Sequence, residues 1–339
     1  MKKVKKVLAV ALVAAMVFGL SACGSSSSSS STTKSSSSAA TSSTKSTSNM
    51  KIEVILKTLA SEYWSYVQAG AVAAGKELGV SVDVVGASSE TSFDEQMSMI
   101  ETALGSSEYS AITIAPLQPD MVATKIADTN IPILAVDTKI PSDKVKTFIG
   151  TGNEAAAKTG GEYAAKQLIA SGVSAPTAVC ISGVQGDTTA EARLSGYKAG
   201  FEGAGGKILE VQYADAVADK AVTVMEGFLQ KYDHIDAVLC NNDDMAMAAA
   251  RAASDAGKAT GTEFVGFDGI SSACKAILAG QETFSVAQDP YQMGYKAVEL
   301  AIKAANGEKL DDFYDTGVEM ITKDNAQARL DKMNGYLGK

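Results

Sequence analysis

Residues 239–248 read LCNNDDMAMA, where an apolar stretch passes directly into polar side chains. A short apolar run, residues 237–240, is followed at once by four carboxamide and carboxylate side chains. The Ala- and Met-rich pattern of a helix then covers residues 243–256. A strand, a polar turn and a helix in this order form half of a βαβ unit. The four polar side chains have three competing roles: a metal or catalytic cluster, a helix N-cap, or a hydrogen-bonding surface for a polar ligand.

The same order of strand, short turn and helix repeats along the chain from Met50 onward. Ten such strands exceed one sheet of ordinary size, so we expect an α/β fold of two doubly wound parallel-sheet lobes. The predicted strands are residues 52–56, 80–85, 111–115, 131–136, 147–149, 177–182, 207–212, 237–240, 263–267 and 283–287. Predicted helices include residues 63–78, 93–105, 153–170, 189–201, 216–231, 243–256 and 291–305.

The N-terminal segment is not part of this fold. Residues 1–22 combine a lysine-rich start with an apolar run shorter than the roughly 20 residues of a membrane span, which predicts a secretory signal peptide. The signal ends in the lipobox LSAC, so we expect Cys23 to be lipidated and to anchor the mature protein to the outer face of the cell membrane. Residues 23–49 are Ser-rich, without acidic or large apolar side chains, which predicts a disordered linker.

Charge and cysteine content argue against several kinds of partner. The signal peptide carries four lysines and no acid, so its removal changes the formal charge from −9 to −13. A protein this acidic is not expected to bind nucleic acid or anionic lipid. Cys180, Cys240 and Cys274 are an odd set without CxxC spacing, and His234 is the sole histidine. We therefore expect no zinc site and no cofactor.

Polar and aromatic side chains gather just after the predicted strands. Ligands of open α/β sheets bind at the carboxyl ends of the strands, so these side chains are candidates for one common site. They are Lys57, Ser61, Tyr63, Trp64, Asp137, Thr138, Arg193, Asn242, Phe267, Asp268 and Gln288. A sugar presents clustered hydroxyls, which carboxylates, arginine and carboxamides bind, and an apolar C–H face, which Trp64 and Phe267 would cover.

Several stretches resemble the sugar-binding proteins of ABC importers, of the ribose- and allose-binding type. They are VILKTL at residues 54–59, DTTAEARLSGYKAGF at 187–201, NNDDMAMAAARAA at 241–253, GFDG at 266–269 and VAQDPYQMG at 286–294. The resemblance runs from about residue 52 to about residue 322. It implies sugar contacts by Ser61, Tyr63, Trp64, Asp137, Arg193, Asn242, Asp268 and Gln288. Thr138 stands where that family has an arginine or an acid.

The resemblance also implies how the chain is divided and what it does. A three-strand hinge crossing near Thr151, Ala287 and Thr316 would join an N-terminal lobe, residues 50–151 and 288–316, to a C-terminal lobe, residues 152–287 and 317–339. We expect a monomer that captures an allose- or psicose-like or ribose-like monosaccharide and delivers it to an ABC transporter permease. The alternative is a receptor for a sugar, autoinducer, inositol or nucleoside that feeds a chemotaxis or signalling partner.

Competing roles remain for single residues. In residues 241–244, Asp243 or Asp244 is expected to cap the following helix and Asn242 to reach the ligand. These residues lack the alternating ligands and the glycine of a calcium loop, so we expect no metal. Lys57 could equally be a solvated strand end, and Gln288 a structural residue of the hinge. The sole histidine, His234, precedes a strand on the far side of its lobe and is poorly placed for a Ser-His-Asp or Cys-His arrangement, and no glycine-rich phosphate loop follows a strand, so we expect no enzyme activity.

Overall fold

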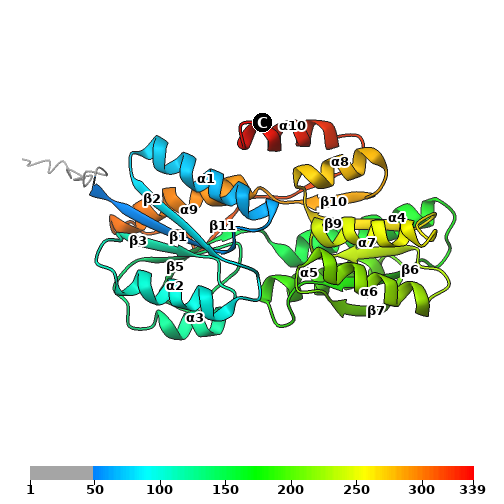
Figure 1. Cartoon of the computed structure of the whole chain (residues 1–339), viewed down its shortest axis with the longest axis horizontal. Coiled ribbons are helices and arrows are strands. Elements are labelled where there is room, and N and C mark those ends of the chain that lie inside the picture. Colours follow the sequence, from blue (N-terminus) through cyan, green and yellow to red (C-terminus); the bar gives the residue numbers. More distant parts are fainter. Residues whose placement is uncertain (1–48) are drawn as a thin grey trace, which may run out of the picture. The chain divides into compact units, whose positions relative to one another are not determined.

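The computed structural model describes residues 49–339. The predicted signal peptide, Cys23 and nearly all of the predicted linker lie outside the described residues. Within the range that is described, none of the helices combines the length and the apolar character needed to cross a membrane. The described chain forms two α/β lobes, each built around one six-stranded sheet (Figure 1).

The first lobe is a parallel sheet with helices on both faces. Its strands are β1 (Lys51–Thr58), β2 (Ser81–Ala87), β3 (Ala111–Ile114), β4 (Ile133–Val136), β5 (Val145–Gly150) and β11 (Phe313–Asp315). Their order in the sheet is β11-β5-β4-β3-β1-β2, and every neighbouring pair is parallel. The helices are α1 (Glu62–Leu78), α2 (Phe93–Gly105), α3 (Pro119–Lys125) and α9 (Pro290–Ala305).

The side chains of β1 alternate between the two faces of this sheet. Ile52 and Val54 pack with α1 and α9, whereas Ile55 packs with α2 and α3 on the opposite face. All three side chains are fully buried. A strand that is covered on both faces has to be apolar at nearly every position, which is why residues 52–56 form an apolar run interrupted only by Glu53.

The second lobe is a mixed sheet. Its strands are β6 (Thr177–Ser182), β7 (Lys207–Tyr213), β8 (Ala237–Cys240), β9 (Glu263–Asp268), β10 (Phe284–Ala287) and β12 (Glu319–Ile321). The order is β12-β10-β9-β8-β6-β7, in which β12 runs antiparallel to β10 and the other pairs are parallel. The helices are α4 (Asn153–Ala170), α5 (Thr188–Gly203), α6 (Ala218–Lys231), α7 (Asp243–Asp255), α8 (Ser271–Ala279) and α10 (Ala326–Tyr336).

Two helix pairs pack in direct backbone contact. A Cβ atom at Gly200 of α5 would lie 2.0 Å from the carbonyl oxygen of Lys158 in α4. A Cβ atom at Gly294 of α9 would lie 1.9 Å from the carbonyl oxygen of Val67 in α1. Only glycine permits so close an approach. Each lobe therefore has one closely packed pair of helices against its sheet. The loops at the carboxyl ends of the strands extend from these two sheets.

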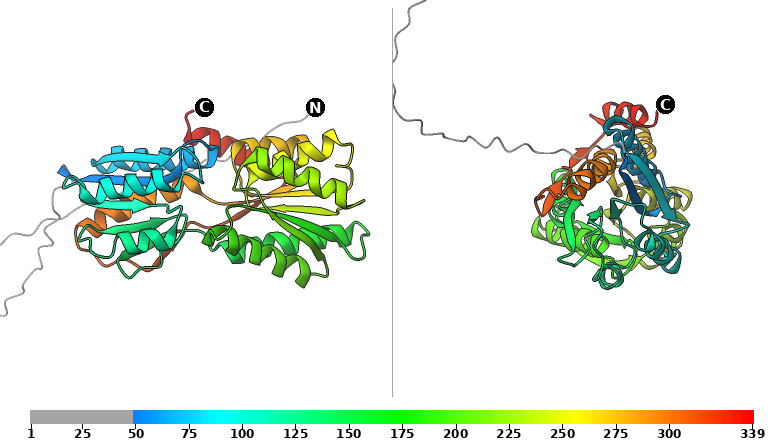
Figure 2. Two further views of the ribbon diagram at one scale, coloured as in Figure 1. Left: turned by 60° about the horizontal axis from the view of Figure 1, so that its bottom comes forward. Right: turned by 90° about the vertical axis from the view of Figure 1, so that its left-hand side faces the viewer.

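The chain passes between the two sheets three times. It leaves β5 for α4, β10 for α9, and β11 for β12. The first and third crossings are tied together, because the backbone N–H of Thr316 donates to the carbonyl oxygen of Gly150 at 2.9 Å. The left view of Figure 2 shows segments of the chain running between the lobes. The predicted fold, two α/β lobes joined by a three-strand hinge, is confirmed.

Two differences between the structure and the sequence prediction concern the shortest strands and the start of α6. The sequence pattern does not predict β11 and β12, because strands of three residues are too short to show a periodicity. The helix expected from residue 216 begins at Ala218, since Asp215 and Ala216 have φ angles of 51° and 60° that a right-handed helix cannot contain.

Candidate ligand-binding site

A cavity of about 420 Å³ lies between the two lobes, where loops at the carboxyl ends of their strands meet. Its lining includes eight of the predicted site residues, namely Lys57, Ser61, Tyr63, Trp64, Asp137, Arg193, Asn242 and Asp268. The first five belong to the first lobe and the last three to the second. The other three, Thr138, Phe267 and Gln288, are not among the lining residues, and each contacts one that is.

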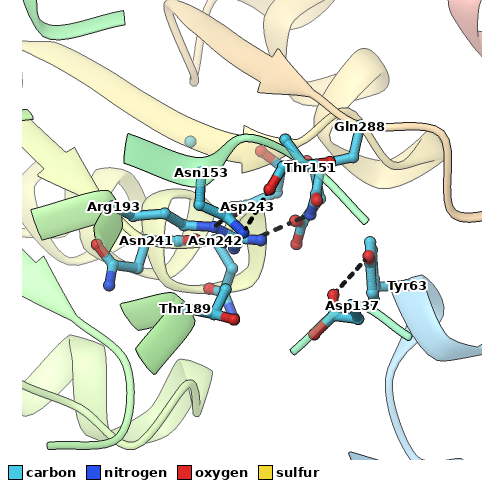
Figure 3. A network of polar contacts seen from close by, with 12 residues as sticks. Tyr63, Asp137, Thr151, Asn153, Thr189, Arg193, Asn241, Asn242, Asp243 and Gln288 are labelled. Carbon is cyan, nitrogen blue, oxygen red and sulfur yellow. Dashed lines mark hydrogen bonds and ion pairs between the residues drawn. The ribbon is translucent and has the colours of Figure 1, made fainter. Parts of the chain in front are cut away.

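Asp137, directly after β4, is held by hydroxyl groups on both of its carboxylate oxygens. The Tyr63 hydroxyl donates to Oδ1 at 2.8 Å (Figure 3). The Thr138 hydroxyl donates to Oδ2, also at 2.8 Å. Asp137 has a φ angle of 62°, in the left-handed region that costs energy for any residue except glycine. Strain of this kind collects at functional sites. Thr138 therefore orients Asp137 in this structure and does not itself reach the cavity.

The guanidinium group of Arg193 is fixed in place by the second lobe (Figure 3). Its Nε donates to Oδ1 of Asn153 at 2.7 Å, and its Nη1 donates to the carbonyl oxygen of Asn241 at 2.7 Å. The ring of Phe267 lies 3.9 Å from the guanidinium carbon and is fully buried. Phe267 thus supports Arg193 from behind by a cation–π contact and does not cover the cavity itself.

Asp268 ends β9 and has a φ angle of 120°, which again is strained for a non-glycine residue. Its Oδ1 accepts a hydrogen bond from Nε2 of Gln288 at 2.6 Å and lies 3.5 Å from Nη1 of Arg193. Burial raises the pKa of Asp268 well above its usual range, and the charge of Arg193 acts in the opposite direction. Gln288 is buried behind Asp268, so its contact orients this carboxylate.

Lys57 and Asp187 form a buried ion pair between the lobes. Lys57 lies near the end of β1, and its Nζ donates to Oδ2 of Asp187 at 2.7 Å, with both side chains 6% exposed. Oδ1 of Asp187 accepts from the N–H of Ala190 at 2.8 Å, so the same carboxylate caps α5. Burial alone would raise the pKa of Asp187, but the charge of Lys57 holds it below its usual value. Lys57 is therefore not a solvated strand end.

Glu90 and Asp187 line the cavity and are absent from the predicted site. Glu90 lies in the loop between β2 and α2, where its Oε1 accepts from the indole N–H of Trp64 at 2.9 Å. The signal that could have found it is the polar stretch that follows the second strand, at the same place where the other strands deliver site residues. Asp187 precedes the helix that carries Arg193, and its position there indicates an N-cap more directly than a site residue.

The four polar residues 241–244 have separate roles. The predicted N-cap at Asp243 or Asp244 is wrong: Asn242 caps α7, its Oδ1 accepting from the N–H of Met245 at 2.9 Å. The helix begins directly after Asn242, so Asp243 turns into the core, where it accepts from Ser285 Oγ at 2.5 Å. Asn242 and Asp244 line the cavity, and so does Asn241, whose carbonyl oxygen binds Arg193.

Comparison with known proteins identifies the family. Residues 52–309 match the family described as periplasmic binding protein domain. The chain belongs to the periplasmic binding protein family.

Relatives of this periplasmic binding protein include sugar-binding proteins. The D-allose-binding periplasmic protein of Escherichia coli K12 is 34% identical over 268 residues, which are 76% of this chain and 85% of the relative. The ribose import binding protein RbsB of the same strain is 29% identical over 277 residues, 80% of this chain and 90% of the relative. Among solved structures, one similar to this chain is the crystal structure of a carbohydrate transporter solute binding protein from Agrobacterium radiobacter in complex with D-arabinose. Its TM-score is 0.77 and its sequence identity 28%, and the match covers 85% of this chain and 99% of that one. The resemblance found in the sequence is confirmed.

Proposed function

We propose that this periplasmic binding protein captures a monosaccharide between its lobes and delivers it, chemically unchanged, to the permease of an ABC transporter. The cavity carries the proposal, because carboxylates from both lobes, aromatic rings from the first and an arginine from the second converge on one space. The relatives and the solved structure, with allose, ribose and arabinose in their names and titles, support a sugar as ligand. An allose- or psicose-like sugar is the first candidate and a ribose-like sugar the second.

The lining has the chemistry that a sugar requires. Asp137 and Asp268 can each accept hydrogen bonds from neighbouring hydroxyls, and Arg193 donates to hydroxyl oxygens. The indole ring of Trp64 can cover an apolar C–H face. The only histidine, His234, pairs with Asp236 at 2.8 Å and is not part of the cavity lining, so a histidine acid or base is not at hand there.

Binding and release would follow from bending at the three crossings. We propose lobes of residues 50–151 with 288–316 and of residues 152–287 with 317–339. Since the polar contacts come from both lobes, neither lobe alone can desolvate the ligand, and the ligand binds the closed form more tightly than the open one. Closure is then a population shift that a permease can recognise by shape.

The N-terminal sequence supports a location outside the cytoplasm. We propose that residues 1–22 are removed, that Cys23 carries the lipid, and that the mature monomer is tethered to the outer face of the cell membrane by residues 23–49. Mass spectrometry of the protein extracted from membranes should show an acylated Cys23 as the first residue. A Cys23→Ala protein should keep its signal peptide or leave the membrane.

The ligand is tested by titration calorimetry and by a thermal-shift screen over aldoses, ketoses and inositols, with amino acids and nucleosides as the comparison set. We expect one monosaccharide to bind with a stoichiometry of one and to raise the melting temperature, because it binds only the folded form. A shift with an amino acid or nucleoside and with none of the sugars would overturn the proposed function.

A further inference from the structure

The cavity lining carries more negative than positive charge. Among its residues, two are cations, and each lies beside a carboxylate: Lys57 is 2.7 Å from Asp187, and Arg193 is 3.5 Å from Asp268. The lining holds six carboxylates in all, Glu62, Glu90, Asp137, Asp187, Asp244 and Asp268. Four of them, Glu62, Glu90, Asp137 and Asp244, therefore have no ion-pair partner within the cavity.

Neutral donors hold Asp137 and Glu90 in place without offsetting their charge. Asp137 accepts from two hydroxyls, as described above, and Glu90 accepts from the indole of Trp64 at 2.9 Å. Burial raises the pKa of Glu90, and the nearby charge of Asp137 adds to the effect, while Lys57 opposes it. In a space with little water, like charges repel more strongly than in bulk solvent, so a compensating positive charge would be favourable there.

The surplus charge also involves both lobes. Glu62 lies on α1 of the first lobe and Asp244 on α7 of the second, and both line the cavity. Burial and the charge of Glu62 together raise the pKa of Asp244, so an acid of the first lobe acts on an acid of the second. A hydroxyl can hydrogen-bond to either acid, but it leaves the repulsion in place.

A metal ion does not fit this arrangement. Among residues 49–339 no group of three or more histidine, cysteine, aspartate or glutamate side chains converges closely enough to hold one. The carboxylates are instead spread around a cavity whose size suits an organic molecule. The compensating charge therefore belongs on the ligand.

We propose that the ligand is a monosaccharide bearing a positively charged amino group, and that this group lies between Glu90 and Asp137. The inference rests on the proposed function and narrows its substrate class. The hydroxyls of the sugar bind Arg193 and Asp268 in the second lobe, and the ammonium group donates charge-assisted hydrogen bonds to the two carboxylates of the first. Glu90 then sets the specificity for the amino group. The cation near its carboxylate is Lys57, and Lys57 is already bound by Asp187.

The test compares amino sugars with their parent sugars by titration calorimetry. The probes are the 2-amino and 3-amino deoxy derivatives of D-glucose, D-galactose and D-allose, each measured against the parent sugar at a pH where the amine is protonated. We expect at least one amino sugar to bind roughly tenfold tighter than its parent, the difference between a charge-assisted and a neutral hydrogen bond.

Two variants locate the effect. Glu90→Gln removes the charge but keeps an amide oxygen that can accept from Trp64, so we expect it to lose most of the tenfold preference. Glu226→Gln, an exposed position on α6 outside the cavity, serves as the matched control and should keep the preference.

The possible results separate the two proposals. Parent sugars that bind as tightly as or tighter than every amino derivative would overturn the amino-group inference and leave the proposed function standing. Failure of both kinds of sugar to bind would overturn the proposed function. A folded Glu90→Gln protein that retains the full preference would overturn the assignment of the amino group to Glu90.

Discussion

Arg193 connects three residues of the second lobe beside the cavity, because its guanidinium group contacts Asn153, Asn241 and Asp268. Replacing it with alanine removes a charged donor from a water-poor site, and we expect a loss of about 2–3 kcal/mol in ligand binding, roughly thirtyfold or more. The change also leaves Asp268 buried without its cation, so we expect a melting temperature lower by several degrees. Calorimetry and circular dichroism measure the two effects.

The matched control is Arg251→Ala, on the exposed face of α7, which should bind and melt like the wild type. An Arg193→Ala protein that behaves like this control would show that the ligand binds elsewhere.

A pair of buried carboxyl groups, Asp243 and Glu282, makes stability depend on pH. Both lie against Gly266, where a Cβ atom would be 2.2 Å from Oδ1 of Asp243 and 2.3 Å from Oε1 of Glu282. Among the described residues, neither Glu282 oxygen has a hydrogen-bond partner. Burial raises the pKa of Asp243 to about 7 and that of Glu282 well above its usual value. A proton shared between the two groups accounts for both observations.

The sign of the pH dependence follows from these raised values. The folded protein keeps protons that the unfolded chain loses above about pH 4, so the free energy of unfolding should fall as pH rises from there through about 7. Glu282→Gln supplies an N–H donor that does not titrate, and we expect a weaker dependence and a more stable protein at about pH 8. Urea unfolding across this range measures it, and a variant with the same slope as the wild type would contradict the shared proton.

At the scale of elements, the contact between α4 and α5 depends on Gly200. A methyl group there would meet the Lys158 carbonyl at 2.0 Å, so Gly200→Ala should push the helices apart and cost about 1–3 kcal/mol of stability. Gly227→Ala in α6 is the control, because nothing lies within 4 Å of its Cβ position. There alanine should stabilise the helix by about 0.5–1 kcal/mol. Equal effects in urea unfolding would mean that helix propensity, and not close packing, governs both sites.

For the whole molecule, the Lys57–Asp187 pair is a contact that forms only when the lobes meet. Lys57→Met keeps the apolar stem of the side chain but leaves Asp187 buried and unpaired in the closed form, whereas the open form exposes it to water. We expect a larger radius of gyration by small-angle scattering and a sugar affinity reduced by about tenfold or more.

Adding Asp187→Asn distinguishes an effect on closure from a direct contact between Lys57 and the ligand. Asparagine still caps α5 and carries no charge, so the double variant should recover much of the lost affinity if the pair acts on closure. No recovery, together with an unchanged radius of gyration in Lys57→Met, would show that Lys57 acts on the ligand alone.

How well the sequence predicts a helix or strand depends on the length of that element. Long elements such as α7 and α9 carry a clear periodicity, whereas three-residue strands such as β11 carry none. The predicted ends of the strands indicate where the cavity lies, but they do not indicate which way each side chain points. Phe267 and Asp268 are consecutive, so one side chain points into the core and the other into the cavity. Partners far apart in sequence, such as Lys57 and Asp187, become visible only once the lobes are in place.

The position of β11 and β12 in the chain affects when folding can finish. Residues 313–321 supply the last edge strand of both sheets, pairing with β5 and β10 respectively. A nascent chain therefore cannot complete either lobe until nearly all of its residues have been synthesised. Such a delay suits a polypeptide that has to be threaded through a translocation pore while still unfolded, because premature folding of the first half would block its passage.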